Sequence, residues 1–166
     1  MSTQRRSRSN IRELTKEESV AFLKSQLIGT LSLTDNKSAY AVPMAYLFDA
    51  DTIFFNLAPE GRKHGYIKAN QSACFSTYEV KADPSNPMVM SWKSVICDGK
   101  VERVMDSDEL TRTVRLLEKS MGKPEGSMQK LLERTLKNPT ASNFWKIKTT
   151  AIGGRGVEGF KEELEE

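Results

Sequence analysis

Residues 28–57 read IGTLSLTDNKSAYAVPMAYLFDADTIFFNL, and the spacing of apolar residues within them decides the fold. Over residues 29–34, apolar or small residues alternate with polar ones, which is the period of a half-buried strand. Turn-forming Asp and Asn residues separate this strand from two more, predicted at residues 38–48 and 52–57. Connections this short cannot form parallel crossovers, so the three strands are predicted to form an antiparallel meander.

The same criteria predict the elements on either side of these strands. Thr15 and Glu18 have the spacing of a capping box, which predicts a first helix beginning near residue 15. Gly99 lies in the middle of a long apolar stretch and indicates a bulge or a sharp bend. The other predicted elements are helices at 62–70, 106–121 and 124–137, strands at 72–80, 90–104 and 143–152, and a loop at 81–87. Six strands with helices between them predict a small antiparallel barrel, closed or partly closed, of the mainly β or α+β class.

Composition indicates one globular domain. The chain has 166 residues, of which 38% are hydrophobic and 28% charged, and this excludes a disordered chain and a collagen. No apolar run approaches the ~18 residues that a membrane-spanning helix needs, so no membrane association is expected. Two cysteines are too few for a disulfide framework, so we expect a reducing, cytoplasmic location. The domain is predicted over residues 11–157, after a basic tail (1–10) and before an acidic tail (158–166).

The basic tail raises the question of a nucleic-acid partner. Residues 1–12 hold four arginines and no acidic residue, whereas the whole chain has a net charge of only +3. A short basic run without aromatic partners is typical of a solvated terminus, and nucleic-acid binding is the alternative that we keep open but do not favour.

The residues that carry most enzymatic chemistry are scarce in this sequence. His64 is the sole histidine, which argues against a metal site of the usual kind, and no nucleophile or phosphate-loop motif is present. No catalytic residue is therefore assigned, and reactivity would come from a bound organic cofactor. Pro43 cannot donate to a sheet ladder, so its strand is predicted to lie at an edge or to be irregular. Arg62 and Lys63 begin a predicted helix, where cations and free amides suit a phosphate. A cationic first turn that faces solvent is the alternative interpretation, which these residues taken alone favour.

The runs over residues 28–79 and 92–104 (WKSVICDGKVERV) resemble the pyridoxamine 5′-phosphate oxidase-related family, and more closely its nitroimidazole-resistance-like branch. The elements that carry the resemblance are VPMAY (42–46), GRK (61–63) and the SV…GKVERV strand, and the final strand resembles the family weakly. The resemblance implies a six-stranded split barrel with peripheral helices. It also implies a homodimer that binds FMN in the groove between subunits.

The resemblance further implies roles for individual residues. Arg62 and Lys63 match the phosphate-binding pair, and Asn56 matches a position that reaches the cofactor. Ser94 matches a polar position that contacts the flavin from the partner subunit. The isoalloxazine ring would be lined by the backbone of Val42, Pro43, Met44 and Ala45 and by Tyr46. Trp92 and Tyr46 could together form an aromatic wall for a planar substrate, or both could be ordinary barrel packing.

The sequence also departs from the family pattern. Nitroimidazole-resistance proteins carry a histidine where this chain has Asn56. The true oxidases carry an arginine where this chain has Tyr40, and an arginine–histidine pair near the C-terminus that is missing here. Oxidation of pyridoxamine phosphate is therefore disfavoured. The leading prediction is an FMN-dependent oxidoreductase that passes hydride through flavin N5 to a small-molecule acceptor. The alternative is a non-catalytic flavin-, haem- or deazaflavin-binding protein of the same fold.

Overall fold

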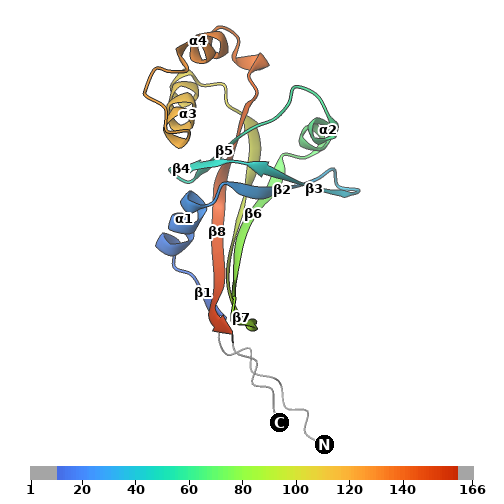
Figure 1. The fold of residues 1–166 in the computed structure, drawn as a ribbon. Helices are drawn as coiled ribbons and strands as arrows, with labels where there is room; N and C mark the ends of the chain where they lie inside the picture. The colour runs from blue at the N-terminus through green and yellow to red at the C-terminus, as the bar shows by residue number, and fades with distance from the viewer. Residues whose placement is uncertain (1–10, 161–166) are drawn as a thin grey trace, which may run out of the picture.

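Between residues 11 and 160, the part of the chain that this computed structural model describes, eight strands form one antiparallel sheet (Figure 1). The strands are β1 (Arg12–Glu13), β2 (Ile28–Thr34), β3 (Ala39–Ala45), β4 (Leu47–Asp49), β5 (Thr52–Asn56), β6 (Ser72–Asp83), β7 (Asn86–Arg103) and β8 (Phe144–Phe160). The helices are α1 (Lys16–Ser25), α2 (Arg62–Ala69), α3 (Ser107–Ser120) and α4 (Gln129–Lys137), with a 3₁₀ turn, η1, at Pro139–Ala141.

The two ends of the sheet are joined by the chain itself. The strand order is β3-β2-β6-β7-β8-β5-β4, so the two terminal strands follow one another in sequence and meet at Tyr46. The Tyr46 amide donates to the Leu27 carbonyl over 3.2 Å and so ties this junction to the chain just before β2. The sheet therefore wraps into a barrel that is split between β3 and β4, as the sequence predicts. β1 is a short addition to the six predicted strands, and β4 arises from the division of one of them.

The predicted meander is wrong in its middle strand. The predicted strand at 38–48 is divided: β3 pairs with β2, and β4 pairs with β5 at the other end of the sheet. β5 instead lies beside β8, which no short-range pattern specifies. Both local hairpins form, but the segment between them crosses from one end of the sheet to the other.

Two further expectations at the strand ends are corrected. The predicted loop at 81–87 is a tight hairpin in which Asp83 lies opposite Asn86, and the Asp83 carboxylate accepts from the Ser85 amide over 2.8 Å. The last strand does not end at the glycines near 153. A Cβ on Gly154 would lie 2.5 Å from Ser19 Oγ, so this glycine admits the close approach of α1, and β8 continues to Phe160. Residues 158–160 thus belong to β8, while residues 1–10 and 161–166 lie outside the described part.

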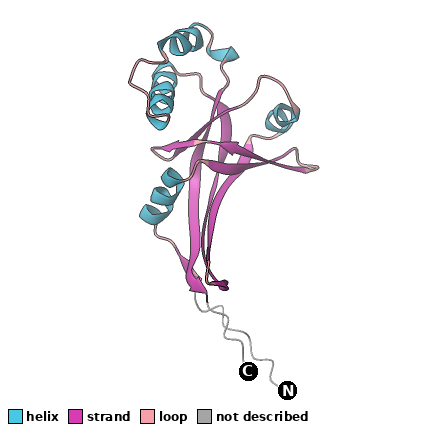
Figure 2. Cartoon of the chain, viewed as in Figure 1, coloured by secondary structure: helices cyan, strands magenta, loops and turns pink. Residues whose placement is uncertain are grey.

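Three long strands determine the outline of the molecule. Figure 2 shows β6, β7 and β8 extending well beyond the strands that cross them. The predicted capping box begins α1: Thr15 Oγ1 accepts from the Glu18 amide over 3.1 Å, and Glu18 Oε2 accepts from the Thr15 amide over 2.8 Å. The first turn of α1 is thereby fixed, and the helix covers one face of β8.

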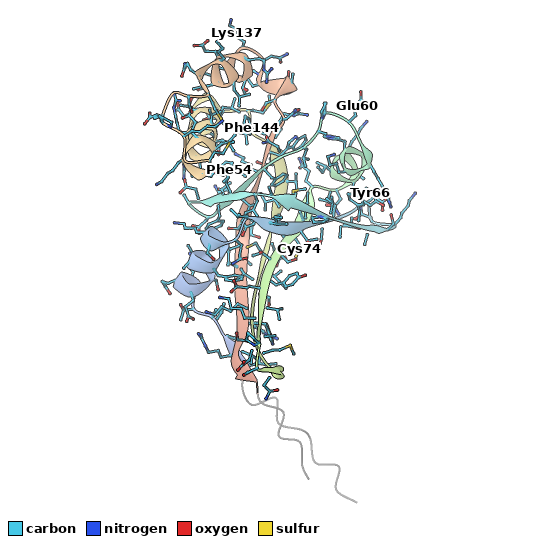
Figure 3. All side chains as sticks on the ribbon, viewed as in Figure 1. Phe54, Glu60, Tyr66, Cys74, Lys137 and Phe144 are labelled. Carbon is cyan, nitrogen blue, oxygen red and sulfur yellow. The ribbon has the colours of Figure 1, made fainter. Side chains whose placement is uncertain are left out.

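The interior consists of two apolar clusters. The larger one fills the barrel and includes the fully buried Leu31, Ile53 and Phe75. The smaller one lies between the sheet and α3–α4, where Phe54 and Phe144 lie beneath the two helices (Figure 3). The amphipathic helices at the top of the barrel therefore pack on the sheet through a core of their own.

A buried carboxylate fixes the connection between α3 and α4. Glu118 accepts from the amides of Gly126 (3.1 Å) and Met128 (2.6 Å) and from the Arg115 guanidinium (3.1 Å). Burial alone would raise the pKa of Glu118, but these donors together hold it below its ordinary value. The carboxylate is thus ionised at neutral pH and holds the connecting loop against α3.

Replacing Gly99 by alanine should destabilise the fold. The register of β7 against β8 shifts between Asp98 and Gly99, and a Cβ on Gly99 would lie 2.4 Å from the Lys148 carbonyl oxygen. Because that contact is with backbone, we expect Gly99→Ala to cost about 1–3 kcal/mol. The measurement is chemical denaturation. Gly65→Ala is the control, since nothing lies within 4 Å of its Cβ; equal stabilities of the two variants would contradict the described bulge.

Candidate functional site

The N-terminus of α2 is a basic helix end without a side-chain cap. Its N-cap is Gly61, whose φ of 124° lies where glycine is favoured, and no side chain hydrogen-bonds to the free amides of the first turn. Arg62 and Lys63 occupy this turn, which contains no acidic residue. The helix dipole and both cations therefore favour an anion at this end.

Arg62 is held in place by two stacked tyrosines. Its Nη2 donates to Tyr66 Oη over 2.9 Å, and its guanidinium lies 5.0 Å from the centre of the Tyr40 ring. The Tyr40 and Tyr66 rings stack at 5.2 Å, and Tyr66 Oη also shares a hydrogen bond with Ser38 Oγ (2.8 Å). The bonds with Ser38 and then Arg62 lower the pKa of Tyr66, and the bond with Tyr66 raises the pKa of Arg62. Arg62 is thereby tied to the start of β3.

Lys63 turns the other way from Arg62. Its Nζ donates to the Glu60 carbonyl over 3.4 Å, and a Cβ on Gly61 would lie 3.3 Å from that Nζ. The lysine thus folds back over the turn that precedes α2. The two cations predicted to hold a phosphate share one helix end, and each has a different protein partner.

The strand with Pro43 is a terminal strand, as predicted. β3 has β2 on one side and no neighbouring strand on the other within the described residues. Val42 and Met44 are half-buried and pack on the core, whereas Pro43 and Ala45 are exposed. Backbone groups along the outer edge of β3 are therefore open to a ligand.

Tyr46 directs its side chain into the barrel. The ring is 5% exposed and packs edge-on against Phe75, with ring centres 4.8 Å apart. Its hydroxyl donates to the Leu23 carbonyl over 2.7 Å, and burial raises its pKa to about 12. At this position only the backbone lies beside the open edge, so the buried Tyr46 ring is barrel packing and not part of an exposed aromatic wall. Trp92 is half-buried on β7.

Asn56 and Ser94 lie far apart within the chain. Asn56 is exposed at the end of β5, opposite Phe144. Ser94 lies on the extended part of β7, nine residue steps before Arg103, which corresponds to about 30 Å of strand. Arg103 is opposite Trp145, the neighbour of Phe144, so Ser94 is remote from the end of β5. A single chain does not bring all the predicted cofactor-binding residues together.

Sequence reasoning missed the tyrosine platform. Ser38, Tyr40 and Tyr66 position Arg62, yet none was predicted as a site residue. The signal was the four-residue spacing between Arg62 and Tyr66, which places both on one face of a helix.

Neither cysteine is an activated nucleophile. Burial raises the pKa of Cys97 to about 12 and also raises the pKa of the half-buried Cys74. In the described part of the chain, no three His, Cys, Asp or Glu side chains converge as metal ligands. No helix among residues 11–160 is long and apolar enough to span a bilayer.

A family model assigns the chain. The model described as pyridoxamine 5′-phosphate oxidase matches residues 15–156, and the chain belongs to this family. The resemblance drawn from VPMAY, GRK and GKVERV is thereby confirmed. No curated protein matches the chain.

Solved structures confirm the fold. A candidate 5-nitroimidazole antibiotic resistance protein from Bacteroides thetaiotaomicron is 19% identical, with a TM-score of 0.69, covering 95% of this chain and 99% of that one. A FAD-binding protein from Mesorhizobium loti is 20% identical, with a TM-score of 0.63 and coverages of 89% and 99%. A FAD and heme binding protein from Mycobacterium smegmatis is 13% identical, with a TM-score of 0.65 and coverages of 93% and 77%.

Removing the Tyr46 hydroxyl should weaken the fold. Tyr46→Phe would leave the buried Leu23 carbonyl without its donor, and we expect a loss of about 1–3 kcal/mol in the free energy of unfolding. Urea denaturation at pH 7 measures it. Ser127→Ala, which removes a hydroxyl from an exposed position, is the control. If both variants unfolded like the unmodified protein, the side chain of Tyr46 would not lie in the barrel as described.

Proposed function

We propose that this protein binds FMN and acts as a flavin-dependent oxidoreductase on a small-molecule acceptor. The observation that carries the proposal is the uncapped, basic N-terminus of α2 lying beside the open edge of β3. A flavin mononucleotide has a dianionic phosphate at one end and a planar ring rich in hydrogen-bonding atoms at the other. Helix amides and cations suit the first, and an unpaired strand edge suits the second, so the residues present fit this group.

Related proteins support a flavin rather than another ligand. Solved structures of the same fold include proteins named for binding FAD, and one named for binding both FAD and heme. In this chain the phosphate would lie between Arg62 and Lys63. The ring would run along residues 42–46, with Asn56 near one end.

We also propose that a second copy of the chain completes the cofactor-binding site. One face of the extended strands is open: Tyr78 is 72% exposed and Ile96 is 50% exposed. Tyr78 lies opposite Ser94 in the β6–β7 ladder, so the two side chains share this face. A second copy packed on it would shield these apolar groups and bring the partner subunit's Ser94 to the flavin of the first.

The residues of this chain would bind and orient rather than exchange protons. When bound, a flavin supplies a two-electron carrier whose N5 atom passes hydride to the acceptor. Backbone amides near Met44 and Ala45 would donate to the ring atoms on which negative charge develops. Asn56 does not titrate, and Tyr46 keeps its proton inside the barrel. The two free thiols, Cys74 and Cys97, fit the reducing cytoplasm that the sequence predicts.

A non-catalytic binding protein is the second candidate. It is favoured by Asn56, because an amide at the end of β5 offers no acid or base to a substrate. Reduced nicotinamide separates the two: an oxidoreductase would lose its flavin colour on addition of NADPH or NADH and regain it with a nitroaromatic or quinone acceptor. A flavin that stays oxidised would favour the binding protein.

Removing both cations should abolish recognition of the flavin phosphate. We expect Arg62→Gln/Lys63→Gln to weaken FMN binding at least tenfold, about 1.4 kcal/mol or more, while riboflavin, which has no phosphate, binds as before. Quenching of flavin fluorescence measures both affinities. Lys16→Gln/Lys24→Gln removes the same charge from the exposed surface of α1 and is the control. Unchanged preference for FMN over riboflavin would contradict the proposed phosphate site.

Disrupting the open sheet face should separate the subunits. The unmodified protein is expected to sediment as a dimer at micromolar concentration, and Ile96→Lys as a monomer with weakened FMN binding, because a charge would be buried at the contact. Lys81→Gln, at an exposed position on the same extended strands, is the control. An unmodified protein that is monomeric and still holds FMN would exclude the shared site.

A further inference from the structure

A cavity of about 610 Å³ lies beside α2. It is bounded by α2 from His64 onward, the start of β6, the end of β7 and the start of β8. Its lining includes His64, Lys68, Lys100, Arg103 and Trp145, and no aspartate or glutamate. A volume of this size is typical of pockets that bind small molecules.

We propose that this cavity is a second anion-binding site, which takes a small molecule bearing a phosphate or diphosphate group. It is separate from the flavin phosphate site because α2 stands between them. At 100° per residue, Tyr66 lies within about 40° of Arg62 around the helix axis, whereas His64 lies about 200° away. Arg62 thus lies on the side of α2 next to β3, and His64 and Lys68 lie on the side that lines the cavity.

The cations of the cavity have no carboxylate to neutralise them. Among residues 11–160, Lys68 and Lys100 form no ion pair, and Arg103 Nη1 donates a hydrogen bond to the Ser142 carbonyl. Lys146, by contrast, is paired with Glu109. Three cations that line one cavity without an acidic residue repel one another, and a multivalent anion would offset that repulsion.

Arg103 is already oriented for such a ligand. Its guanidinium lies 4.5 Å from the centre of the Trp145 ring, and the bond to the Ser142 carbonyl fixes it from the other side. A stacked guanidinium keeps its remaining N–H groups in a rigid fork, the geometry that recognises phosphate oxygens in pairs. Little side-chain entropy would be lost when the anion binds.

The walls around the cations are fixed by internal hydrogen bonds. Asn70 Nδ2 donates to Asn36 Oδ1 over 2.8 Å, and Asn70 Oδ1 accepts from the Ser72 amide over 2.9 Å. His64 Nε2 donates to the Ala58 carbonyl over 2.7 Å, which fixes the ring at the wall of the cavity. The cavity therefore has a preformed polar wall, and its charge selects phosphate groups over neutral molecules.

Titration calorimetry with inorganic pyrophosphate tests the proposal on the full-length protein in saturating FMN, which fills the proposed flavin phosphate site. We expect one saturable site per chain with an affinity that falls as salt rises, and binding at least about tenfold weaker in Lys68→Gln/Lys100→Gln. Both lysines are exposed, so the substitutions leave the fold intact. Lys16→Gln/Lys24→Gln, with the same loss of charge on α1, should bind as the unmodified protein does.

The flavin site is distinguished by a third variant. Arg62→Gln/Lys63→Gln should keep its affinity for pyrophosphate although it loses its preference for FMN. A negative result in the FMN experiment would not affect the proposed pyrophosphate site, since the two sites lie on opposite sides of α2. The proposal is overturned if the unmodified protein shows no saturable binding, if Lys68→Gln/Lys100→Gln binds equally well, or if the Arg62/Lys63 variant loses pyrophosphate.

Discussion

The fold depends on one junction, at Tyr46, where a single segment passes from one end of the sheet to the other. β3 and β4 are terminal strands of the same sheet, and they are consecutive in sequence. The buried Tyr46 ring and its bond to the Leu23 carbonyl hold the junction against the core. Because the chain turns away here, no strand among residues 11–160 covers the outer edge of β3. The open edge that we propose for a flavin ring follows from how the barrel is closed.

α2 lies between the two anion sites that we propose. Its first turn carries Arg62, which is tied to β3 through the stacked Tyr40 and Tyr66. Its opposite side carries Lys68 over a cavity without acidic residues. An eight-residue helix thus carries basic residues on both sides, one for each proposed anion. The extended strands add a third element, an open face that bears the exposed Tyr78 and Ile96.

Much of this arrangement could be predicted because its signals are local. The alternation at 29–34 gives β2, the capping box gives α1, Pro43 marks an edge strand, and Gly99 marks a bulge. Three features could not be predicted because they depend on distant contacts. β5 pairs with β8, which is distant in sequence. Gly154 allows α1 to approach the sheet and does not mark the end of a strand. The closure of the barrel determines that the Tyr46 side chain points inward. The same limit applies to Arg103 and Lys100, which meet α2 only in the folded chain.

The flavin content of the purified protein tests the central claim most directly. Visible absorbance gives the ratio of flavin to chain, and chromatography of the material released by heat identifies the nucleotide. The account predicts a yellow protein that holds, or takes up on addition, one FMN per chain. A colourless protein that binds no FMN at micromolar concentration would contradict it, whatever the similarity of its fold to flavin-binding relatives.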